Sequence, residues 1–231
     1  MKRLLNYFTK WELILWSSSV LFITVFFMMF DRSSYFNLIT SLLGASALIF
    51  CAKGHPLGQL MIFIFGILYG IISYSFDYYG EMMTYMGMSC PMALIALISW
   101  LRHPYKGNKS EVEVNRLKGL DYLIGILLSL LVTAVFYFIL KYFDTANLIP
   151  STVSVTTTFF AVYLTAKRSP FYALAYAAND IVLIILWVLA TFNDISYISV
   201  VVCFTVFLVN DIYGFINWEK MQKKQRETID Y

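Results

Sequence analysis

The sequence N-D-I-V-L-I-I-L-W runs from Asn179 to Trp187, and a second stretch, N-D-I-Y-G-F-I-N-W, runs from Asn210 to Trp218. In both, an Asn-Asp-Ile triplet is followed by five residues and a tryptophan, inside an apolar run long enough to cross a bilayer. A carboxylate at the centre of a spanning helix costs about 2.5–3.5 kcal/mol on insertion scales. The two pairs therefore predict a polar functional site in the membrane interior.

The composition around these stretches excludes a water-soluble protein. Hydrophobic residues make up 60% of the 231 residues, and only 13% are charged. So few charges cannot cover the apolar surface of a soluble domain. Apolar runs of about 20 residues, the length that a bilayer requires, recur along the chain and leave no room for a separate soluble domain.

We therefore predict an all-α, polytopic membrane protein with eight spanning helices in a single transmembrane domain. The predicted spans are 12–30, 36–52, 58–76, 82–101, 122–143, 148–166, 170–191 and 197–218, and a charged tail follows at 219–231. The lengths favour helices over strands, since strands of a membrane barrel would alternate polar and apolar residues. The first run is too long for the core of a signal peptide and lacks a small-residue cleavage pattern.

The positions of lysine and arginine predict the orientation. If the N-terminus is cytoplasmic and the eight helices alternate, all 17 Lys and Arg residues except Arg32 and Lys141 fall on the cytoplasmic side. This asymmetry is what the positive-inside rule demands, and it places both termini in the cytoplasm.

A shift of 114 residues indicates an internal repeat, because it places Pro56 on Pro170 and Lys53 on Lys167. Beyond a longer loop the shift becomes 118, and the sequence 98–100 (I-S-W) falls on 216–218 (I-N-W). The spans within 36–101 and 148–218 then form two three-helix units, joined by the helix 122–143. A single linker helix gives both units the same orientation, as in parallel-repeat transporters. The helix 12–30 is an addition, so we expect a 1+3+1+3 order.

Helix geometry groups the candidate site residues. Asp180 and Trp187 are seven residues apart and share one face of their helix, and Tyr176 lies one turn before Asp180. Asp211 repeats this geometry in the last span, and each adjacent asparagine lies about 100° around the helix. Amides donate and accept hydrogen bonds, carboxylates accept them, and Trp can face a cation. The set suits a flat aromatic ligand with polar groups and a positive ring.

Structural interpretations compete with each of these assignments. Asn and Asp residues often join membrane helices by hydrogen bonds alone, and Gln59 can be a packing residue. Trp218, at the cytoplasmic end of its helix, is more simply explained as an interfacial aromatic. The repeat matches the two Asn-Asp pairs to Phe65-Gly66 and Met92-Ala93, so we expect the polar site to be built asymmetrically, from the second unit.

Signatures of other functions are absent from the sequence. It contains no H-E-x-x-H, G-x-S-x-G or Walker motif and no Cys/His cluster with metal-ligand spacing. Three cysteines in separate apolar segments form no disulfide framework. We therefore expect no enzyme activity, no cofactor, no metal and no nucleic-acid partner. The expected partners are a small-molecule substrate and the lipid bilayer, and a homo-oligomer is left open.

The chain resembles a known family, the bacterial nicotinamide riboside transporters of the PnuC type. The segments that carry the resemblance are His55–Gln59 (H-P-L-G-Q), Tyr79–Glu81 (Y-G-E), Asn179–Ile181 (N-D-I) and Asn210–Trp218. The last segment is the most specific, and the likeness extends from the second span to Trp218. One departure is His55, where many relatives have tryptophan.

The resemblance implies a fold similar to that of SWEET sugar transporters and a location in the bacterial plasma membrane. It also implies facilitated diffusion of nicotinamide riboside, with intracellular trapping by phosphorylation. The predicted substrate-binding residues are Gln59, Tyr176, Asn179, Asp180, Trp187, Asn210 and Asp211. Three alternatives stay open: transport of thiamine or riboflavin on the same fold, a non-transporting membrane sensor or partner protein, and proton-coupled transport through Asp180 and Asp211.

Overall fold

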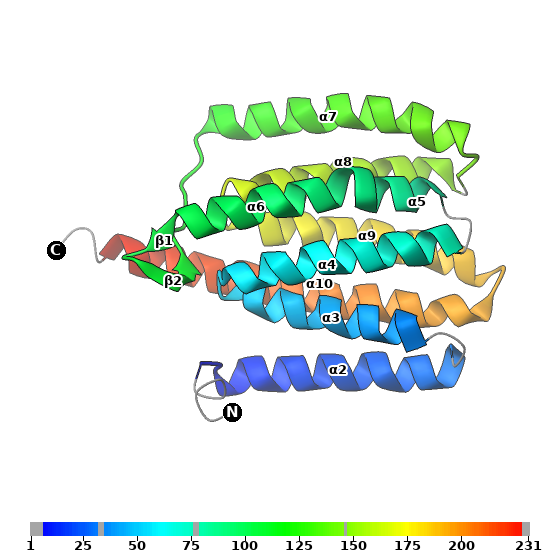
Figure 1. Ribbon diagram of the computed structural model, residues 1–231, viewed down its shortest axis with the longest axis horizontal. Coiled ribbons are helices and arrows are strands. Elements are labelled where there is room, and N and C mark those ends of the chain that lie inside the picture. The colour runs from blue at the N-terminus through cyan, green and yellow to red at the C-terminus, as the bar shows by residue number, and fades with distance from the viewer. Residues whose placement is uncertain (1–6, 32–34, 76–78, 146, 228–231) are drawn as a thin grey trace.

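The protein is a bundle of long helices with a small hairpin at one end (Figure 1). The computed structural model describes residues 7–31, 35–75, 79–145 and 147–227. Within these residues, eight helical segments are long and apolar enough to cross a membrane. The predicted all-α, multi-pass membrane fold is therefore confirmed.

The elements follow one another as a series of helices with a single interruption. The helices are α2 (Lys10–Phe30), α3 (Tyr35–Ala52), α4 (Pro56–Ser75), α5 (Tyr79–Thr84), α6 (Cys90–Arg102), α7 (Gly119–Tyr142), α8 (Leu148–Ala166), α9 (Phe171–Thr191) and α10 (Ile198–Glu227). A π-helical turn, Tyr85–Ser89, joins α5 and α6 into one continuous span, and a 3-10 turn, Ile195–Tyr197, precedes α10.

The interruption is an antiparallel hairpin of two strands, β1 (Pro104–Tyr105) and β2 (Asn108–Val112). Lys106 and Gly107 form its tip with φ angles of 47° and 76°. Positive φ at both central residues is the geometry of the tight turn that suits a two-residue hairpin. The sequence analysis did not predict this hairpin, because its short strands are mostly polar and lack a clear alternation.

Each predicted span coincides with a helix, with differences of a few residues at the ends. The largest difference is at α10, which continues to Glu227, so the charged tail predicted at 219–231 begins as a helix. Residues 228–231 lie outside the described residues, and so do Lys2, Arg3 and Arg32 of the charge distribution.

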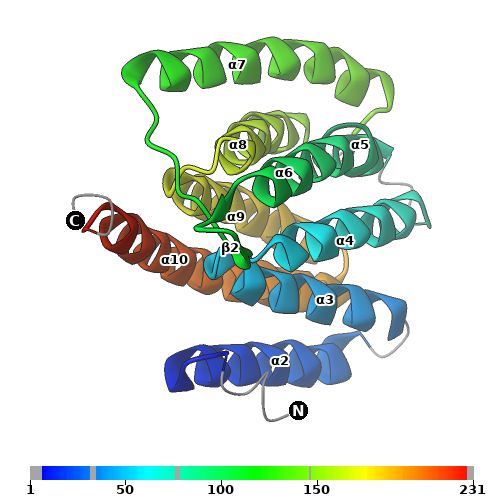
Figure 2. The same cartoon turned by 60° about the vertical axis from the view of Figure 1, so that its left-hand side comes forward.

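Six of the helices form a closed ring. Contacts run from α3 through α4, α6, α8 and α9 to α10, and α10 packs against α3 to complete the circle. Two helices lie outside this ring: α7 packs against α8, and α2 packs against α3 and α10 (Figures 1 and 2). The helices of the two predicted units thus each form one half of the ring.

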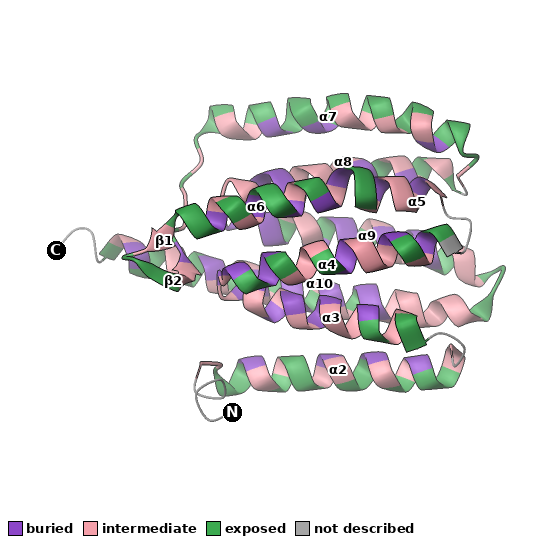
Figure 3. Ribbon diagram, in the orientation of Figure 1, coloured by how far each residue is buried: buried purple, intermediate pink, exposed green. Residues whose placement is uncertain are grey.

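The outer faces of the bundle are apolar. The helices α2 and α7 bury only narrow stripes and leave most of their surface exposed (Figure 3). On α7, Leu127, Leu131 and Phe138 are 57–69% exposed. A surface of this kind requires the hydrocarbon of a bilayer to cover it.

Glu12 fixes α2 to the ring. Its backbone N–H donates to Thr9 Oγ1 at 3.2 Å, which caps the start of the helix. Its carboxylate, 1% exposed as a residue, accepts hydrogen bonds from Lys53 Nζ at 3.1 Å and from Tyr213 OH at 2.9 Å. A buried charge needs such partners, and here they come from the α3–α4 turn and from α10.

The hairpin end of the bundle holds a core of aromatic side chains. Trp100 and Trp218 are both fully buried, with ring centroids 5.2 Å apart. Val112 of β2 belongs to the same cluster, so the hairpin covers it. The interpretation of Trp218 as an interfacial aromatic is therefore wrong, because the hairpin and the extended α10 enclose this end of the helix. Its indole Nε1 donates to the carbonyl of Cys51 at 2.8 Å.

Candidate functional site

A cavity of about 80 Å³ lies inside the ring of helices, and we call it the central cavity. Most of its lining comes from α4, α9 and α10. Five of the seven predicted site residues line it: Gln59, Tyr176, Asn179, Asp180 and Asp211. The structure thus brings together residues that are up to 152 positions apart in the sequence.

The helix α9 supplies more polar side chains to the central cavity than any other helix. Tyr172, Tyr176, Asp180 and Leu183 follow each other at helical spacing and all line the central cavity. The neighbouring helices α8 and α10 pack against α9, and the residues of its cavity-facing side are withdrawn from lipid. Asp180 is 4% exposed and Asn179 5%.

Hydroxyl groups of α8 hold the side chain of Asn179 in place. Its Oδ1 accepts hydrogen bonds from Thr157 Oγ1 at 2.7 Å and from Thr158 Oγ1 at 3.0 Å. Its Nδ2 donates to none of the other described residues. Because the oxygen is occupied, the amide N–H groups are the part of Asn179 that remains available to a ligand.

Two carboxyl groups form an acidic wall of the central cavity. Asp180 comes from α9 and Asp211 from α10, and both line the central cavity. Both residues are at most 5% exposed. Two acidic side chains that line one cavity in a membrane interior are costly unless they serve a ligand or a relay.

The wall formed by α4 is mostly apolar. Phe65 and Gly66, which the internal repeat matches to Asn179 and Asp180, line the same cavity. Gln59 is the polar exception on α4, and its Nε2 donates to the sulfur of Cys51 at 3.3 Å. The cavity therefore combines a carboxylate and amide side with an aromatic side.

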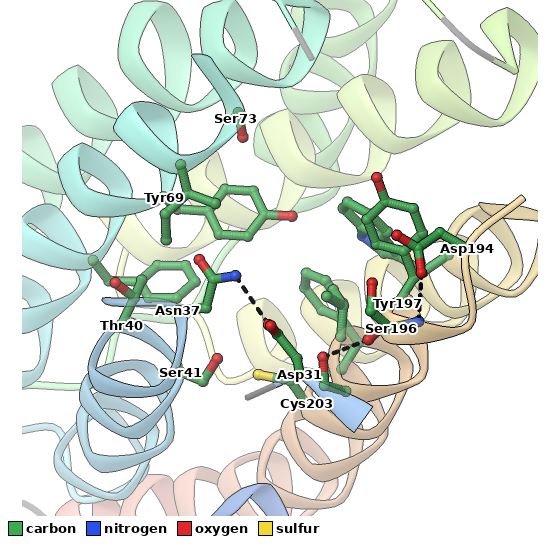
Figure 4. A pocket seen from close by; sticks show the side chains of 16 residues that line it. Asp31, Asn37, Thr40, Ser41, Tyr69, Ser73, Asp194, Ser196, Tyr197 and Cys203 are labelled. Carbon is green, nitrogen blue, oxygen red and sulfur yellow. Dashed lines mark hydrogen bonds between the residues drawn. The ribbon is translucent and has the colours of Figure 1, made fainter. Parts of the chain in front are cut away.

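A second cavity, of about 160 Å³, lies at the end of the bundle opposite the hairpin, and we call it the outer cavity (Figure 4). Trp187, a predicted site residue, lines this cavity instead of the central one. Phe65 and Phe204 line both cavities. These two rings therefore separate the outer cavity from the central one.

Two further carboxylates line the outer cavity. Asp31 accepts a hydrogen bond from Asn37 Nδ2 at 3.2 Å, and Asp194 accepts one from the backbone N–H of Ser196 at 2.9 Å (Figure 4). The Ser196 N–H holds the pKa of Asp194 below its usual range, so this carboxyl is ionised at neutral pH. Sequence reasoning missed both aspartates. Their position at the ends of apolar runs, on the side with few basic residues, was the available signal.

Asn210 lies away from both cavities. Its Nδ2 donates to Ser19 Oγ of α2 at 3.0 Å and to the carbonyl of Val206 at 2.8 Å. Positions 210 and 211 are about 100° apart on the helix, so Asp211 faces the cavity while Asn210 faces α2. The structure therefore places Asn210 where it joins helices, which was the competing interpretation of the sequence.

The side chains that line the two cavities are acidic or uncharged. Among the described residues, no Lys, Arg or His lines either of them. Four aspartates do, namely Asp31, Asp180, Asp194 and Asp211. Such a site favours a cation or a neutral polar ligand and disfavours an anion.

Spanning helices that surround a polar cavity, withdrawn from lipid and approached from one end of the bundle, define a membrane transporter for a small solute. A family model described as "Nicotinamide mononucleotide transporter" matches residues 34–220. The chain belongs to this family.

Two further similarities agree with this assignment. The chain is 26% identical over 227 residues to the nicotinamide riboside transporter PnuC of Neisseria mucosa, a match that covers 96% of this chain and 86% of that protein. It also superimposes on the crystal structure of the vitamin B3 transporter PnuC with a TM-score of 0.80, at 24% identity and 94% coverage of each chain. The resemblance stated from the sequence is thus confirmed.

Proposed function

We propose that this chain carries nicotinamide riboside across the bacterial plasma membrane by facilitated diffusion. The family description names the mononucleotide, whereas the relative from Neisseria mucosa is named for the riboside. The two compounds differ by one phosphate group. The charge of the side chains that line the cavities favours one of the two compounds as substrate.

The observation that carries the proposal is the acidic wall without a basic partner. Nicotinamide riboside is a pyridinium cation, which the carboxyl pair Asp180 and Asp211 attracts. The mononucleotide adds a phosphate, which would enter a cavity that no Lys, Arg or His among the described residues lines. A phosphate at about 5 Å from a carboxylate is repelled by about 3 kcal/mol per charge pair at an effective dielectric constant near 20. The cavity therefore supports the nucleoside over the nucleotide.

The other groups of the central cavity match the remaining parts of the ligand. The amide N–H groups of Asn179 are suited to a carbonyl acceptor such as the carboxamide oxygen. Gln59 and Tyr176 supply polar groups for ribose hydroxyls, and Phe65 supplies a flat wall for the ring. We assign Trp187 to the access route, because it lines the outer cavity.

For orientation, we propose that the hairpin end is cytoplasmic. The hairpin, the start of α2 and the end of α10 all lie at this end (Figure 1). The loops here carry most of the basic residues, as the positive-inside rule requires. The outer cavity then opens to the periplasmic side, and α3–α6 and α8–α10 act as the two units that move around the central cavity.

No nucleotide-binding motif is present in the sequence, so a downhill flux needs a sink inside the cell. Phosphorylation of the nucleoside in the cytoplasm supplies one, because the product carries the charge that the cavity rejects. We propose no enzyme activity and no cofactor for the chain itself.

Uptake by proteoliposomes tests the proposal. Purified protein in liposomes should take up radiolabelled nicotinamide riboside down its gradient, and the mononucleotide should enter about a hundredfold more slowly. Thiamine and riboflavin serve as competitors. Equal uptake of the mononucleotide, or faster uptake of a competing vitamin, would refute the assignment of substrate. Uptake that follows an imposed pH gradient would replace facilitated diffusion by proton coupling.

A further inference from the structure

Two side chains of α6 cap the end of α8 on the hairpin side. Ser99 Oγ donates to the carbonyl of Ala166 at 2.7 Å, and Trp100 Nε1 donates to the carbonyl of Thr165 at 2.9 Å. The carbonyls in the last turn of a helix have no partner within that helix. We call α3, α4 and α6 the first half of the ring and α8, α9 and α10 the second half. The first half thus supplies hydrogen-bond donors to the free carbonyls at the end of a helix in the second half.

Two side chains of α10 do the same for α3. Asn217 Nδ2 donates to the carbonyl of Ala52 at 2.7 Å, and Trp218 Nε1 donates to the carbonyl of Cys51 at 2.8 Å. Here the second half of the ring supplies hydrogen-bond donors to the carbonyls at the end of a helix in the first half. The four bonds therefore join the two halves reciprocally, at one end of the bundle.

The internal repeat relates one pair of bonds to the other. The acceptors Cys51 and Thr165 are 114 positions apart, which is the first shift of the repeat. The donors Trp100 and Trp218 are 118 positions apart, which is the second shift. Equivalent donors thus reach equivalent acceptors in the opposite unit, as a two-fold symmetric contact between two units requires.

This contact forms the floor of the central cavity. Cys51 and Tyr172 line the cavity, and the ring of Tyr172 lies 4.9 Å from that of Trp218. Tyr172 OH also donates to the carbonyl of Cys51 at 3.1 Å, and Cys51 Sγ accepts from Gln59. A ligand that contacts Gln59 or Tyr172 is therefore one residue away from the exchanged bonds.

The backbone is arranged so that these bonds can be released. The carbonyl of Cys51 also accepts from the N–H of Gly54 at 2.9 Å, and the carbonyl of Thr165 also accepts from the N–H of Arg168 at 2.9 Å. When a tryptophan leaves, neither carbonyl is left without a partner. A carbonyl that loses one of two donors keeps a hydrogen bond, and this loss is far less costly than leaving a buried carbonyl with no donor.

We propose that the four exchanged hydrogen bonds are the cytoplasmic gate of the transporter, and that this structure shows the gate closed. Release of the ligand toward the cytoplasm requires both pairs to separate, because each pair alone still joins the two halves of the ring. The proposal rests on the orientation and the transport activity given above, but not on the identity of the substrate.

Native cysteines report the state of the gate. Cys51 lies at the gate, on the floor of the central cavity, whereas Cys203 lines the outer cavity. One background keeps only Cys51 (C90S and C203S), and a second keeps only Cys203 (C51S and C90S). Everted membrane vesicles expose the cytoplasmic side to a membrane-impermeant methanethiosulfonate reagent, and right-side-out vesicles expose the other side. No ligand is needed, so the measurement stands even if the substrate assignment fails.

Trp218→Phe keeps an aromatic ring and removes the indole donor. In everted vesicles it should raise the rate of Cys51 modification about fivefold, the usual effect of one hydrogen bond. In right-side-out vesicles it should lower the rate for Cys203, because opening one side closes the other. Trp100→Phe should give the same two changes, since the contact is symmetric. The double variant should change both modification rates by more than either single variant does.

The matched control is Trp16→Phe. Trp16 also donates an indole hydrogen bond, to Ser46 Oγ at 3.0 Å, but it lies on the outer helix α2. This variant should leave both rates unchanged. Wild-type rates for Cys51 in both Trp100→Phe and Trp218→Phe would overturn the gate and leave a purely structural contact. If the tryptophan variants do not fold, Ser99→Ala and Asn217→Ala each remove one of the four exchanged bonds and leave the rings in place. Unchanged Cys51 rates in both would equally overturn the gate.

Discussion

Asp180→Asn separates a binding role from a packing role, because the two predict different combinations of effects. Asp180 is 4% exposed and lines the central cavity together with Asp211. The substitution keeps the shape of the side chain and removes its charge. A pyridinium ring at about 5 Å from a carboxylate gains about 3 kcal/mol at an effective dielectric constant near 20. The affinity for nicotinamide riboside should therefore fall about a hundredfold.

The same substitution should stabilise the protein without ligand. An amide is less costly in a membrane interior than a carboxylate, which costs about 2.5–3.5 kcal/mol on insertion scales. The thermal midpoint in detergent should accordingly rise by a few degrees. Weaker binding combined with higher stability is the trade-off expected at a functional site.

Isothermal titration calorimetry and thermal melting on the purified protein measure the two effects. Asp144→Asn is the matched control, because Asp144 is an exposed loop residue with a φ of 49°, a conformation that Asn also tolerates. It should change neither quantity. Unchanged affinity together with a lower midpoint in Asp180→Asn would refute the reasoning, because the aspartate would then serve only to join helices.

Three further predictions concern the scaffold. Gly58→Ala places a methyl group 2.6 Å from the backbone of α3 and should destabilise the fold by about 1–3 kcal/mol, whereas Gly119→Ala, with open space around it, should be neutral in the same melting assay. Glu12→Gln removes the ion pair with Lys53 and should cost about 2 kcal/mol; an unchanged melting midpoint would contradict the anchoring of α2. Burial lowers the pKa of His55, so the unfolded chain binds the proton more readily. Its contribution to stability should be complete above about pH 6.5 and lost as the pH falls through the lowered pKa, and chemical denaturation of His55→Asn should not show this loss.

Hydropathy and length were sufficient to predict the spanning helices, because the bilayer imposes a minimum length on every apolar segment. They were not sufficient for the polar stretch between α6 and α7, where β1 and β2 form. Short hairpins depend on turn geometry, here at Lys106 and Gly107, which apolar periodicity does not detect. The same hairpin explains why Trp218 is buried, contrary to its expected place at the membrane interface.

The candidate site shows the same limit at the level of single residues. The two N-D-I stretches have identical spacing, yet Asn179 lines the central cavity while Asn210 contacts Ser19 of α2. Spacing fixes the angle between two side chains on a helix. It does not fix the rotation of that helix in the bundle, which depends on the neighbours that pack against it. The extra helix α2 is such a neighbour for α10, whereas the main neighbours of α9 are the ring helices α8 and α10.

The central claim is that the buried polar groups of α9 and α10 surround the path of a cationic nucleoside. A crystal structure with nicotinamide riboside tests it most directly. The account predicts density for the ligand between α4, α9 and α10, with its ring next to Asp180 and its carboxamide within hydrogen-bonding distance of Asn179. Density confined to a basic surface of the protein, or a central cavity closed by contact between Gln59 and Asp211 with the ligand bound elsewhere, would contradict it.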